Sequence, residues 1–305
     1  MSLYFIKAGL QTSIQDSGRH GFMHLGISHS GAMDKNSQQM ANRLVDKPPD
    51  SAVLEITLIG PTIRFDSATS IAICGARFNL TLNNQPVANN ETIKVAKDDE
   101  LEFKQALNGA RAYLAFAGEL SLKRILKSYS THLTAKLGGF ENRQITDGDH
   151  LETKGDRLLA YKKVPEQLDF NYSGNYLLRC VASVESELFS PQQTEQFFSQ
   201  KYQVTSELNR MGIKLQGDPL KFENKLEIVS SGLTQGSIQI TPSGQPIISS
   251  VDGQTIGGYP RIANIISTDL PLLGQITAGD QLRFTQVDQA FAESSLRAAQ
   301  KLLDS

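Results

Sequence analysis

The feature that most constrains the fold is a succession of short strand-like runs along nearly the whole chain. Each run is rich in Val, Ile, Leu, Phe or Thr, and Asn, Gly or Pro residues separate the runs. This spacing favours a barrel or sandwich over alternating strands and helices. We therefore expect a mainly β fold. The runs include 53–58, 62–65, 70–74, 78–82, 100–103, 112–116, 176–181, 237–240, 246–249, 263–267 and 281–285.

Helix signals are few. Asp34 is placed to cap a helix that ends near residue 44, and Asp288 is placed to cap a helix at the end of the chain. Ser190 followed by Pro191 is typical of an N-cap and first helical residue, here of a helix through residue 198. We therefore expect only a few short helices beside the strands.

An acidic turn that leads into a strand recurs along the chain. It occurs at residues 98–103, 147–151 and 278–284, and its first and last copies begin about 180 residues apart. This repeat predicts two domains of related design, 1–165 and 175–287, followed by a helix over 288–305. The polar stretch 162–174 is the expected linker between them.

Composition and charge exclude several classes of partner. The formal net charge of −2 leaves no electrostatic basis for binding nucleic acid, and no apolar stretch is long enough to span a membrane. The N-terminus lacks the pattern of a signal peptide, so a cytoplasmic location is expected. Cys74 and Cys180 both lie in apolar runs, which favours buried free thiols over reactive ones.

Common catalytic and binding motifs are missing from the sequence. It has no phosphate-binding GxxxxGK[ST] loop, no GxGxxG, HExxH or CxxC, and no Met-Lys-Met biotin acceptor. Thr255 imitates the nucleophile of a GxSxG elbow, but Pro260 prevents the helix that such an elbow requires. His20, His24 and His29 lie among glycines without a matching ligand pattern, so we expect no metal site.

A glycine-rich segment over residues 15–34 is the first candidate for function. Its four glycines permit positive φ angles and close approach of the backbone to a ligand, and Asp16, Arg19 and Asp34 lie among them. Long ordered loops are often functional, although a long structural connector remains the alternative.

A polar segment over residues 250–261 is the second candidate. Asp252, Gln254 and Arg261 offer an acid, an amide and a guanidinium within ten positions. An arginine fork suits a carboxylate, while glutamine and backbone groups suit an amide. We expect this segment to hold a small planar amide or carboxylate, with a wide hairpin as the alternative.

Two further charged residues have open interpretations. Arg210 lies beside a flexible Met-Gly step, where an arginine in a site and one on the surface are equally plausible. Glu55 lies inside an apolar strand-like run, and a buried unpaired carboxylate is too costly to persist. An exposed position is therefore favoured for Glu55.

An ordered set of short motifs gives the sequence a family resemblance from about residue 3 to residue 285. The chain resembles the biotin-dependent carboxyltransferase family, also called the allophanate hydrolase subunit 2 family, which includes the C subunit of 5-oxoprolinase. The resemblance implies two cyclophilin-like β-barrel domains. The matching residues are Gln15-Asp16-x-Gly18-Arg19-x-Gly21, Gly31–Asp34, Ala41-Asn42-x-Leu44-Val45, Leu54-Glu55-x-Thr57, Gly60-Pro61, Arg111-x-Tyr113–Ala115, Arg210–Gly212, Gly236-x-Ile238-Gln239, Gln245–Ile247, Asp252-x-Gln254-Thr255-x-Gly257–Pro260 and Asp269-Leu270.

The resemblance also implies an activity that depends on other chains. It points to the C subunit of an ATP-dependent 5-oxoprolinase complex, which converts 5-oxo-L-proline to L-glutamate. The implied partners are a homologue of allophanate hydrolase subunit 1, which corresponds to the B subunit of 5-oxoprolinase, and the A subunit of 5-oxoprolinase. ATP and magnesium would be shared with those partners, and biotin would not be attached to this chain.

Two alternatives to this activity remain open. In one, the chain is the carboxyltransferase component of a urea carboxylase or urea amidolyase reaction and receives carboxybiotin from another chain. In the other, it is a non-enzymatic regulatory partner of a subunit 1 homologue.

The two polar segments together form the expected site, and the roles of their residues follow from the resemblance and the local chemistry. Aspartates would position or activate reacting groups, arginines would bind anions, and the second segment would hold the amide. The expected catalytic residues are Asp16, Asp34 and Asp252, and the expected substrate-binding residues are Arg19, Arg210, Gln254, Thr255, Gly257, Gly258, Tyr259 and Arg261.

Overall fold

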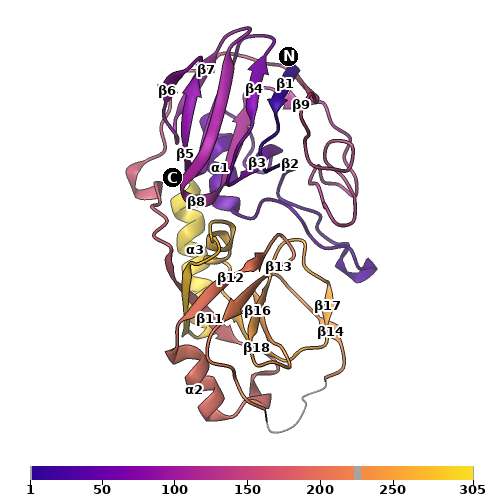
Figure 1. Ribbon diagram of the computed structural model, residues 1–305, viewed down its shortest axis with the longest axis vertical. Helices are drawn as coiled ribbons and strands as arrows, with labels where there is room; N and C mark the ends of the chain where they lie inside the picture. Colours follow the sequence, from indigo (N-terminus) through magenta and orange to yellow (C-terminus); the bar gives the residue numbers. More distant parts are fainter. Residues whose placement is uncertain (1, 223–227, 305) are drawn as a thin grey trace. The chain divides into compact units, whose positions relative to one another are not determined.

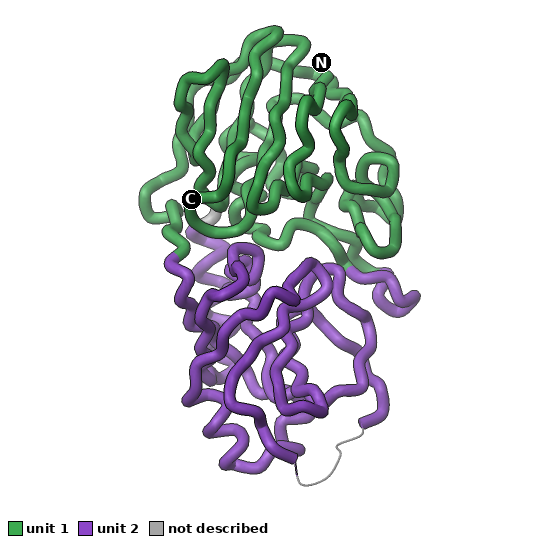
Figure 2. The backbone as a smooth tube through the Cα atoms, in the orientation of Figure 1, with its two compact units in different colours: residues 1–21, 29–172 green, residues 22–28, 173–305 purple. Residues whose placement is uncertain are grey.

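The computed structural model describes residues 2–222 and 228–304. The chain forms two compact units, and Figure 2 colours them separately. The first contains residues 1–21 and 29–172, and the second contains residues 22–28 and 173–305. The short segment 22–28, which includes the 3-10 helix η1 (Met23–Leu25), is thus grouped with the second unit, which the sequence did not indicate.

The first unit is built on one ten-stranded sheet (Figure 1). Its two longest strands, β5 (Thr69–Leu82) and β8 (Glu100–Phe116), pair antiparallel over most of their length. The path through the sheet is β2 (Gln11–Gln15), β3 (Val53–Thr57), β8, β4 (Thr62–Phe65), β1 (Ser2–Lys7), β10 (His150–Lys154) and β9 (Glu119–Leu120), while β6 (Gln85–Val87) and β7 (Thr92–Val95) pair with β5.

Both faces of this sheet are buried where β5 and β8 lie side by side. Alternate side chains of a strand point to opposite faces. On β8, Leu114 and Phe116 pack into the main core, whereas Tyr113 and Ala115 pack on the other face with α1 (Lys35–Leu44). This explains why these strands are nearly continuous apolar runs rather than alternating ones.

The second unit contains a closed seven-stranded barrel. Its first and last strands, β11 (Asn175–Ala182) and β19 (Gln281–Gln286), pair in parallel and close it. A separate two-stranded sheet joins β14 (Ser231–Gly232) to β17 (Ile256–Gly257). The order around the barrel is β11, β18 (Arg261–Ile265), β15 (Ser237–Ile240), β16 (Pro246–Ser249), β13 (Gly212–Gln216), β12 (Tyr202–Leu208) and β19.

The three predicted helices are confirmed, and each begins with the expected cap. The Asp34 side chain accepts a hydrogen bond from the Ser37 N–H at the start of α1. Ser190 forms a reciprocal capping box at the start of α2 (Pro191–Ser199), and Asp288 accepts from the Phe291 N–H at the start of α3 (Gln289–Asp304). Short 3-10 helices occur at Glu166–Leu168 (η2), Ser186–Leu188 (η3) and Leu270–Gly274 (η4).

The expected mainly β architecture is confirmed, with one difference between the units. The second unit is a closed barrel, whereas the path through the first unit's sheet ends at β2 and β9. Cys74 and Cys180 are buried free thiols, as predicted, and burial raises the pKa of both. Among the described residues, no helix is both long and apolar enough to cross a membrane.

Candidate functional site

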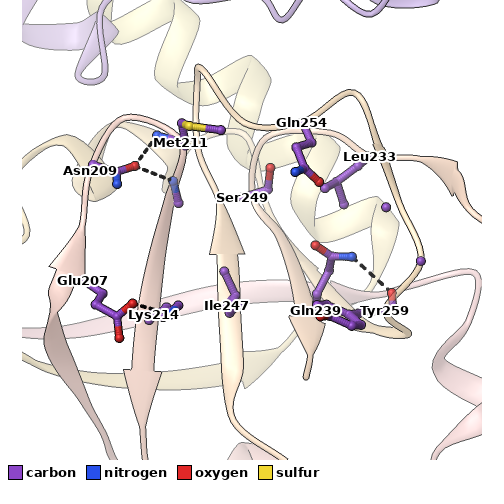
Figure 3. A pocket seen from close by; sticks show the side chains of 13 residues that line it. Glu207, Asn209, Met211, Lys214, Leu233, Gln239, Ile247, Ser249, Gln254 and Tyr259 are labelled. Carbon is purple, nitrogen blue, oxygen red and sulfur yellow. Dashed lines mark hydrogen bonds and ion pairs between the residues drawn. The ribbon is translucent and has the colours of Figure 1, made fainter. Parts of the chain in front are cut away.

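A pocket of about 500 Å³ opens on the outer side of the barrel of the second unit (Figure 3). Strands β12, β13, β15 and β16 form its floor, and the segment from Gln254 to Tyr259 forms one wall. Its volume lies within the usual range for small-molecule sites. The lining residues are Glu207, Asn209, Met211, Gly212, Lys214, Leu233, Gln239, Ile247, Ser249, Gln254, Gly257, Gly258 and Tyr259.

The floor of the pocket follows from the alternation of the barrel strands. Ile213, Ile238 and Ile248 are fully buried in the barrel. The neighbouring positions therefore point to the opposite side, where Gln239 and Ser249 line the pocket. The barrel thus fixes these polar side chains on rigid strands rather than on loops.

The wall from Gln254 to Tyr259 is held by backbone pairing. The Leu233 N–H donates to the Thr255 carbonyl at 2.9 Å, and the strand pair β14–β17 continues this contact. The pairing places the predicted residues Gln254, Gly257 and Gly258 along the wall. Thr255 contributes this backbone contact and is not among the lining residues.

Most polar groups in the pocket are neutral. The Asn209 side chain accepts from the Met211 and Gly212 N–H groups at 2.7 and 3.3 Å and fixes the turn between β12 and β13. Gln239 donates to the Tyr259 carbonyl at 3.2 Å. Amide and hydroxyl groups offer both donors and acceptors to a ligand.

One pair of charges lies at the pocket. Lys214 and Glu207 form an ion pair on adjacent strands, with side chains 47% and 66% exposed. Solvent screens such a pair, so it contributes little to stability. The Lys214 ammonium group can therefore leave Glu207 at a cost of at most about 1 kcal/mol.

Arg210 and Asp252 were expected in the site, and the structure pairs them with each other. The Arg210 Nε–Asp252 Oδ2 distance is 2.8 Å, and the Nη2–Oδ1 distance is 3.1 Å. Both side chains are buried, and neither lines the pocket. The pair joins the turn at Asn209 to the segment that begins at Ser250, so it holds two walls of the pocket together. A role in binding or catalysis stays a prediction for both residues.

Arg261 is also held by a carboxylate of its own unit. Its Nε and backbone N–H both donate to Glu185 Oε2 at 2.9 Å, and its Nη2 donates to Ser231 Oγ at 2.9 Å. The hydrogen bonds from Arg261 lower the pKa of Glu185, and the same pairing raises the pKa of Arg261. Arg261 thus holds β14, which pairs with β17 in the pocket wall, and its predicted role as an anion ligand is untested.

In the first unit, Asp16 is the acceptor at the centre of a polar cluster. Its Oδ1 accepts from the Gly18 N–H at 2.8 Å, from Ser128 Oγ at 2.7 Å and from Ser130 Oγ at 2.5 Å. Its Oδ2 accepts from the Tyr129 N–H at 2.6 Å. Four donors hold this buried carboxylate, so it joins the segment after β2 to residues more than 110 positions away.

Arg19 is fully buried beside this cluster. Its Nη2 donates to the Ser130 and Leu137 carbonyls. Gly138 packs against the guanidinium so closely that a Cβ there would clash with Nη2. Within this unit Arg19 therefore ties two loop segments together, and its predicted contact with substrate is untested.

Asp34 and Glu55 belong to a second buried network, and the expectation that Glu55 is exposed was wrong. Glu55 is 1% exposed and accepts from the Met33 N–H and the Tyr113 hydroxyl, both at 2.9 Å, with Arg111 Nε 3.7 Å away. The Tyr113 hydroxyl accepts from the Asp34 N–H at 2.7 Å. The carboxylate persists in the core because these partners satisfy it. Burial and the nearby Glu55 raise the pKa of Tyr113 well above its ordinary value.

Two of the three histidines lie close together. The rings of His20 and His29 lie 5.0 Å apart, and burial together with the nearby His20 lowers the pKa of His29. The described part of the chain contains no group of three His, Cys, Asp or Glu side chains that could hold a metal ion.

The structure brings together some predicted site residues and adds others. Gln254, Gly257, Gly258 and Tyr259 line one pocket. The sequence reasoning did not select the strand residues that complete it. The strand residues could have been found from polar side chains at every second position of an otherwise apolar strand, as in Ser237–Ile240. The convergence of the two polar segments on one site stays a prediction. The residues that were missed are Glu207, Asn209, Met211, Gly212, Lys214, Leu233, Gln239, Ile247 and Ser249.

Similar proteins of known family match nearly the whole chain. The C subunit of 5-oxoprolinase from Escherichia coli strain K12 is 36% identical over 301 residues, which cover 98% of this chain and 94% of that protein. The Haemophilus influenzae protein of the same name is 33% identical over 294 residues, with 96% and 94% covered.

A solved structure also matches. The crystal structure of the Kluyveromyces lactis urea amidolyase is 29% identical and has a TM-score of 0.94 over 99% of this chain, which spans 20% of that longer protein. The family model described as "Carboxyltransferase domain, subdomain A and B" matches residues 25–286. The resemblance seen in the sequence is therefore confirmed, and the chain belongs to this carboxyltransferase-domain family.

Proposed function

We propose that this chain is the C subunit of a 5-oxoprolinase complex, which opens 5-oxo-L-proline to L-glutamate with the use of ATP. The observation that carries the proposal is the match to two proteins named as this component of 5-oxoprolinase across nearly their whole length. A shared family alone would leave the reaction open. The nearly complete coverage of both proteins makes the same role in a complex the simplest interpretation.

The chemistry of the pocket agrees with a small amide as ligand. Its lining includes the side-chain amides of Asn209, Gln239 and Gln254 and the hydroxyl of Ser249. These neutral groups complement a lactam, which has one N–H donor and one carbonyl acceptor. Lys214 lies at the same pocket and offers a positive charge to the substrate carboxylate.

We propose that partner proteins supply most of the groups that bind Mg²⁺ and ATP. Magnesium prefers carboxylate, phosphate and water oxygens in an octahedral arrangement. In residues 2–222 and 228–304, no three acidic or histidine side chains are placed to hold an ion, and the buried Asp16 and Asp252 are already hydrogen-bonded. The proposed partners are a homologue of allophanate hydrolase subunit 1, equivalent to the B subunit of 5-oxoprolinase, and the A subunit of 5-oxoprolinase.

The structural match to urea amidolyase favours a second candidate. In this alternative the chain transfers a carboxyl group from carboxybiotin to urea or a related amide. The biotin would be carried by another chain, because this sequence lacks a Met-Lys-Met acceptor. Both candidates place a small amide in the pocket.

Reconstitution of the complex tests the proposal. The chain would be co-purified with homologues of the A and B subunits of 5-oxoprolinase, and glutamate formed from 5-oxoproline and ATP would be measured. The expected result is glutamate release that needs all three chains and stops when any one is omitted. Carboxylation of urea by the chain with a biotinylated carrier, without glutamate release, would support the carboxyltransferase instead. A stable complex that shows neither reaction would overturn both and favour a regulatory role.

A further inference from the structure

We propose that Oε1 of Gln239 accepts a hydrogen bond from the amide N–H of the ligand, so that the pocket selects ligands with a free amide N–H. This inference rests on the proposed function for the identity of the substrate. It goes beyond that function by naming the group that recognises the amide.

The orientation of the Gln239 side chain is fixed by the backbone. Its Nε2 donates to the Tyr259 carbonyl at 3.2 Å, and a carbonyl can only accept. The amide therefore cannot rotate by 180° without losing this bond and placing two oxygens against each other. Oε1 is left on the side away from Tyr259, as Figure 3 shows.

Oε1 faces the pocket and is open to a ligand. Gln239 is only 9% exposed and lines the pocket. Among the residues that the structure describes, none donates a hydrogen bond to this oxygen. Oε1 keeps some solvent exposure, so a ligand N–H can replace water at this acceptor, whereas a group that cannot donate would leave it unsatisfied.

Two local features of the fold aim this side chain. The pairing of β15 with β18 shifts register between Ile238 and Gln239, with Ile262 of β18 as the extra residue, and such a bulge increases the local twist where Gln239 lies. Gly257 lies so close that a Cβ there would be 2.6 Å from Gln239 Nε2. The absence of a side chain at position 257 therefore leaves room for the amide at this place.

An acceptor in this position distinguishes a ligand with an N–H group from an analogue in which another group replaces the N–H. A lactam or urea N–H can donate to Oε1, whereas a ring CH₂ leaves the oxygen unsatisfied. Sites built to bind a polar group reject the analogue that lacks it far more strongly than sites that recognise shape alone. The inferred ligand class is therefore a small amide with at least one free N–H.

Binding of a matched pair of ligands tests the inference. The pair is 5-oxo-L-proline and 3-oxocyclopentane-1-carboxylate, in which CH₂ replaces N–H. Calorimetry would compare the wild-type chain with Gln239→Leu, and Gln203→Leu would serve as control because Gln203 is exposed on β12 and lies outside the pocket. We expect the wild type and the control to prefer the lactam by about tenfold or more. We expect Gln239→Leu to bind the two ligands equally, with unfolding temperature showing that it folds.

The outcomes separate this inference from the proposed function. Equal binding of both ligands by the wild type, no binding of either, or an unchanged preference in Gln239→Leu would overturn the inference even if the complex releases glutamate. A lactam preference that disappears in Gln239→Leu supports it even if the complex releases none, in which case the proposed function alone fails.

Discussion

Arg210 and Asp252 form a buried bidentate ion pair, with 2.8 Å between Nε and Oδ2 and 3.1 Å between Nη2 and Oδ1. The Asp252 N–H also donates to the Arg210 carbonyl at 2.8 Å. These contacts join residues 42 positions apart, and their near neighbours Met211 and Gln254 line the pocket. The pair therefore determines where the walls lie, whether or not either side chain meets the substrate.

Removal of one partner is expected to destabilise the second unit. Asp252→Ala leaves Arg210 buried without its carboxylate, and breaking a buried pair in this way costs about 3–5 kcal/mol. The double variant Arg210→Met with Asp252→Leu should regain most of the loss, because it removes both charges. Urea unfolding measures these free energies. Loss of turnover in Asp252→Ala with an unchanged free energy of unfolding would contradict this and support catalysis.

Features of the fold could be predicted from the sequence where the interacting residues are close together along the chain. The caps of the three helices were predicted because the bonds lie within three residues, as between Asp34 and Ser37 or Ser190 and Gln193. Strand positions were predicted because hydrophobicity and turn residues are also local signals. Closure of the barrel by β11 and β19 had no such signal, since the two strands lie about a hundred positions apart.

Separation along the chain also decided which parts of the candidate site could be predicted. The wall of the pocket lies within one segment and was predicted as a unit. The structural contacts of the charged residues could not be predicted, because their partners lie far away in the sequence: Glu185 lies 76 positions from Arg261, and Ser130 lies 114 from Asp16. Glu55 was wrongly expected to be exposed because its buried partner Tyr113 lies 58 residues away.

Asp16→Ala is expected to destabilise the first unit. It removes the acceptor of four hydrogen bonds at a buried position, and bonds to a charged group contribute about 1.5–3 kcal/mol each, although not additively. We expect a loss of about 3 kcal/mol or more in the free energy of unfolding, measured in urea. Asp50→Ala is the control, because Asp50 is exposed. If the folded fraction of Asp16→Ala keeps full turnover in the complex, Asp16 is structural; a fully stable variant without turnover would show the reverse.

Glu185 is expected to make the second unit less stable as the pH becomes acidic. Its hydrogen bonds from Arg261 lower its pKa below the ordinary value of 4.5. Since the unfolded state binds the proton more readily, the contribution of Glu185 is complete well above pH 4.5 and is lost as the pH falls through the lower pKa of the folded state. Glu185→Gln should therefore unfold more easily at pH 7, by about 1–2 kcal/mol, and this difference should shrink below about pH 4.5.

Thermal unfolding from pH 7 to pH 3 measures this dependence. Glu187→Gln is the matched control, since Glu187 is exposed and lies two residues away. A constant difference between wild type and Glu185→Gln over the whole range would show that the carboxylate charge is not what stabilises Arg261.

Gly257→Ala is expected to impair ligand binding while leaving the fold intact. The new Cβ would lie 2.6 Å from Gln239 Nε2, and the end of a flexible side chain yields more easily than backbone. Gln239 should therefore swing away from Tyr259, so that affinity for 5-oxoproline falls about tenfold or more while the free energy of unfolding falls only by about 1 kcal/mol, the contribution of the lost hydrogen bond. Gly232→Ala, on the paired strand β14, is the control, because a Cβ there meets nothing within 4 Å. Calorimetry and urea unfolding of both variants give the comparison. Equal affinities for the two would show that the position of Gln239 does not govern binding, whereas a large loss of stability in Gly257→Ala would show that the wall itself yields before the side chain does.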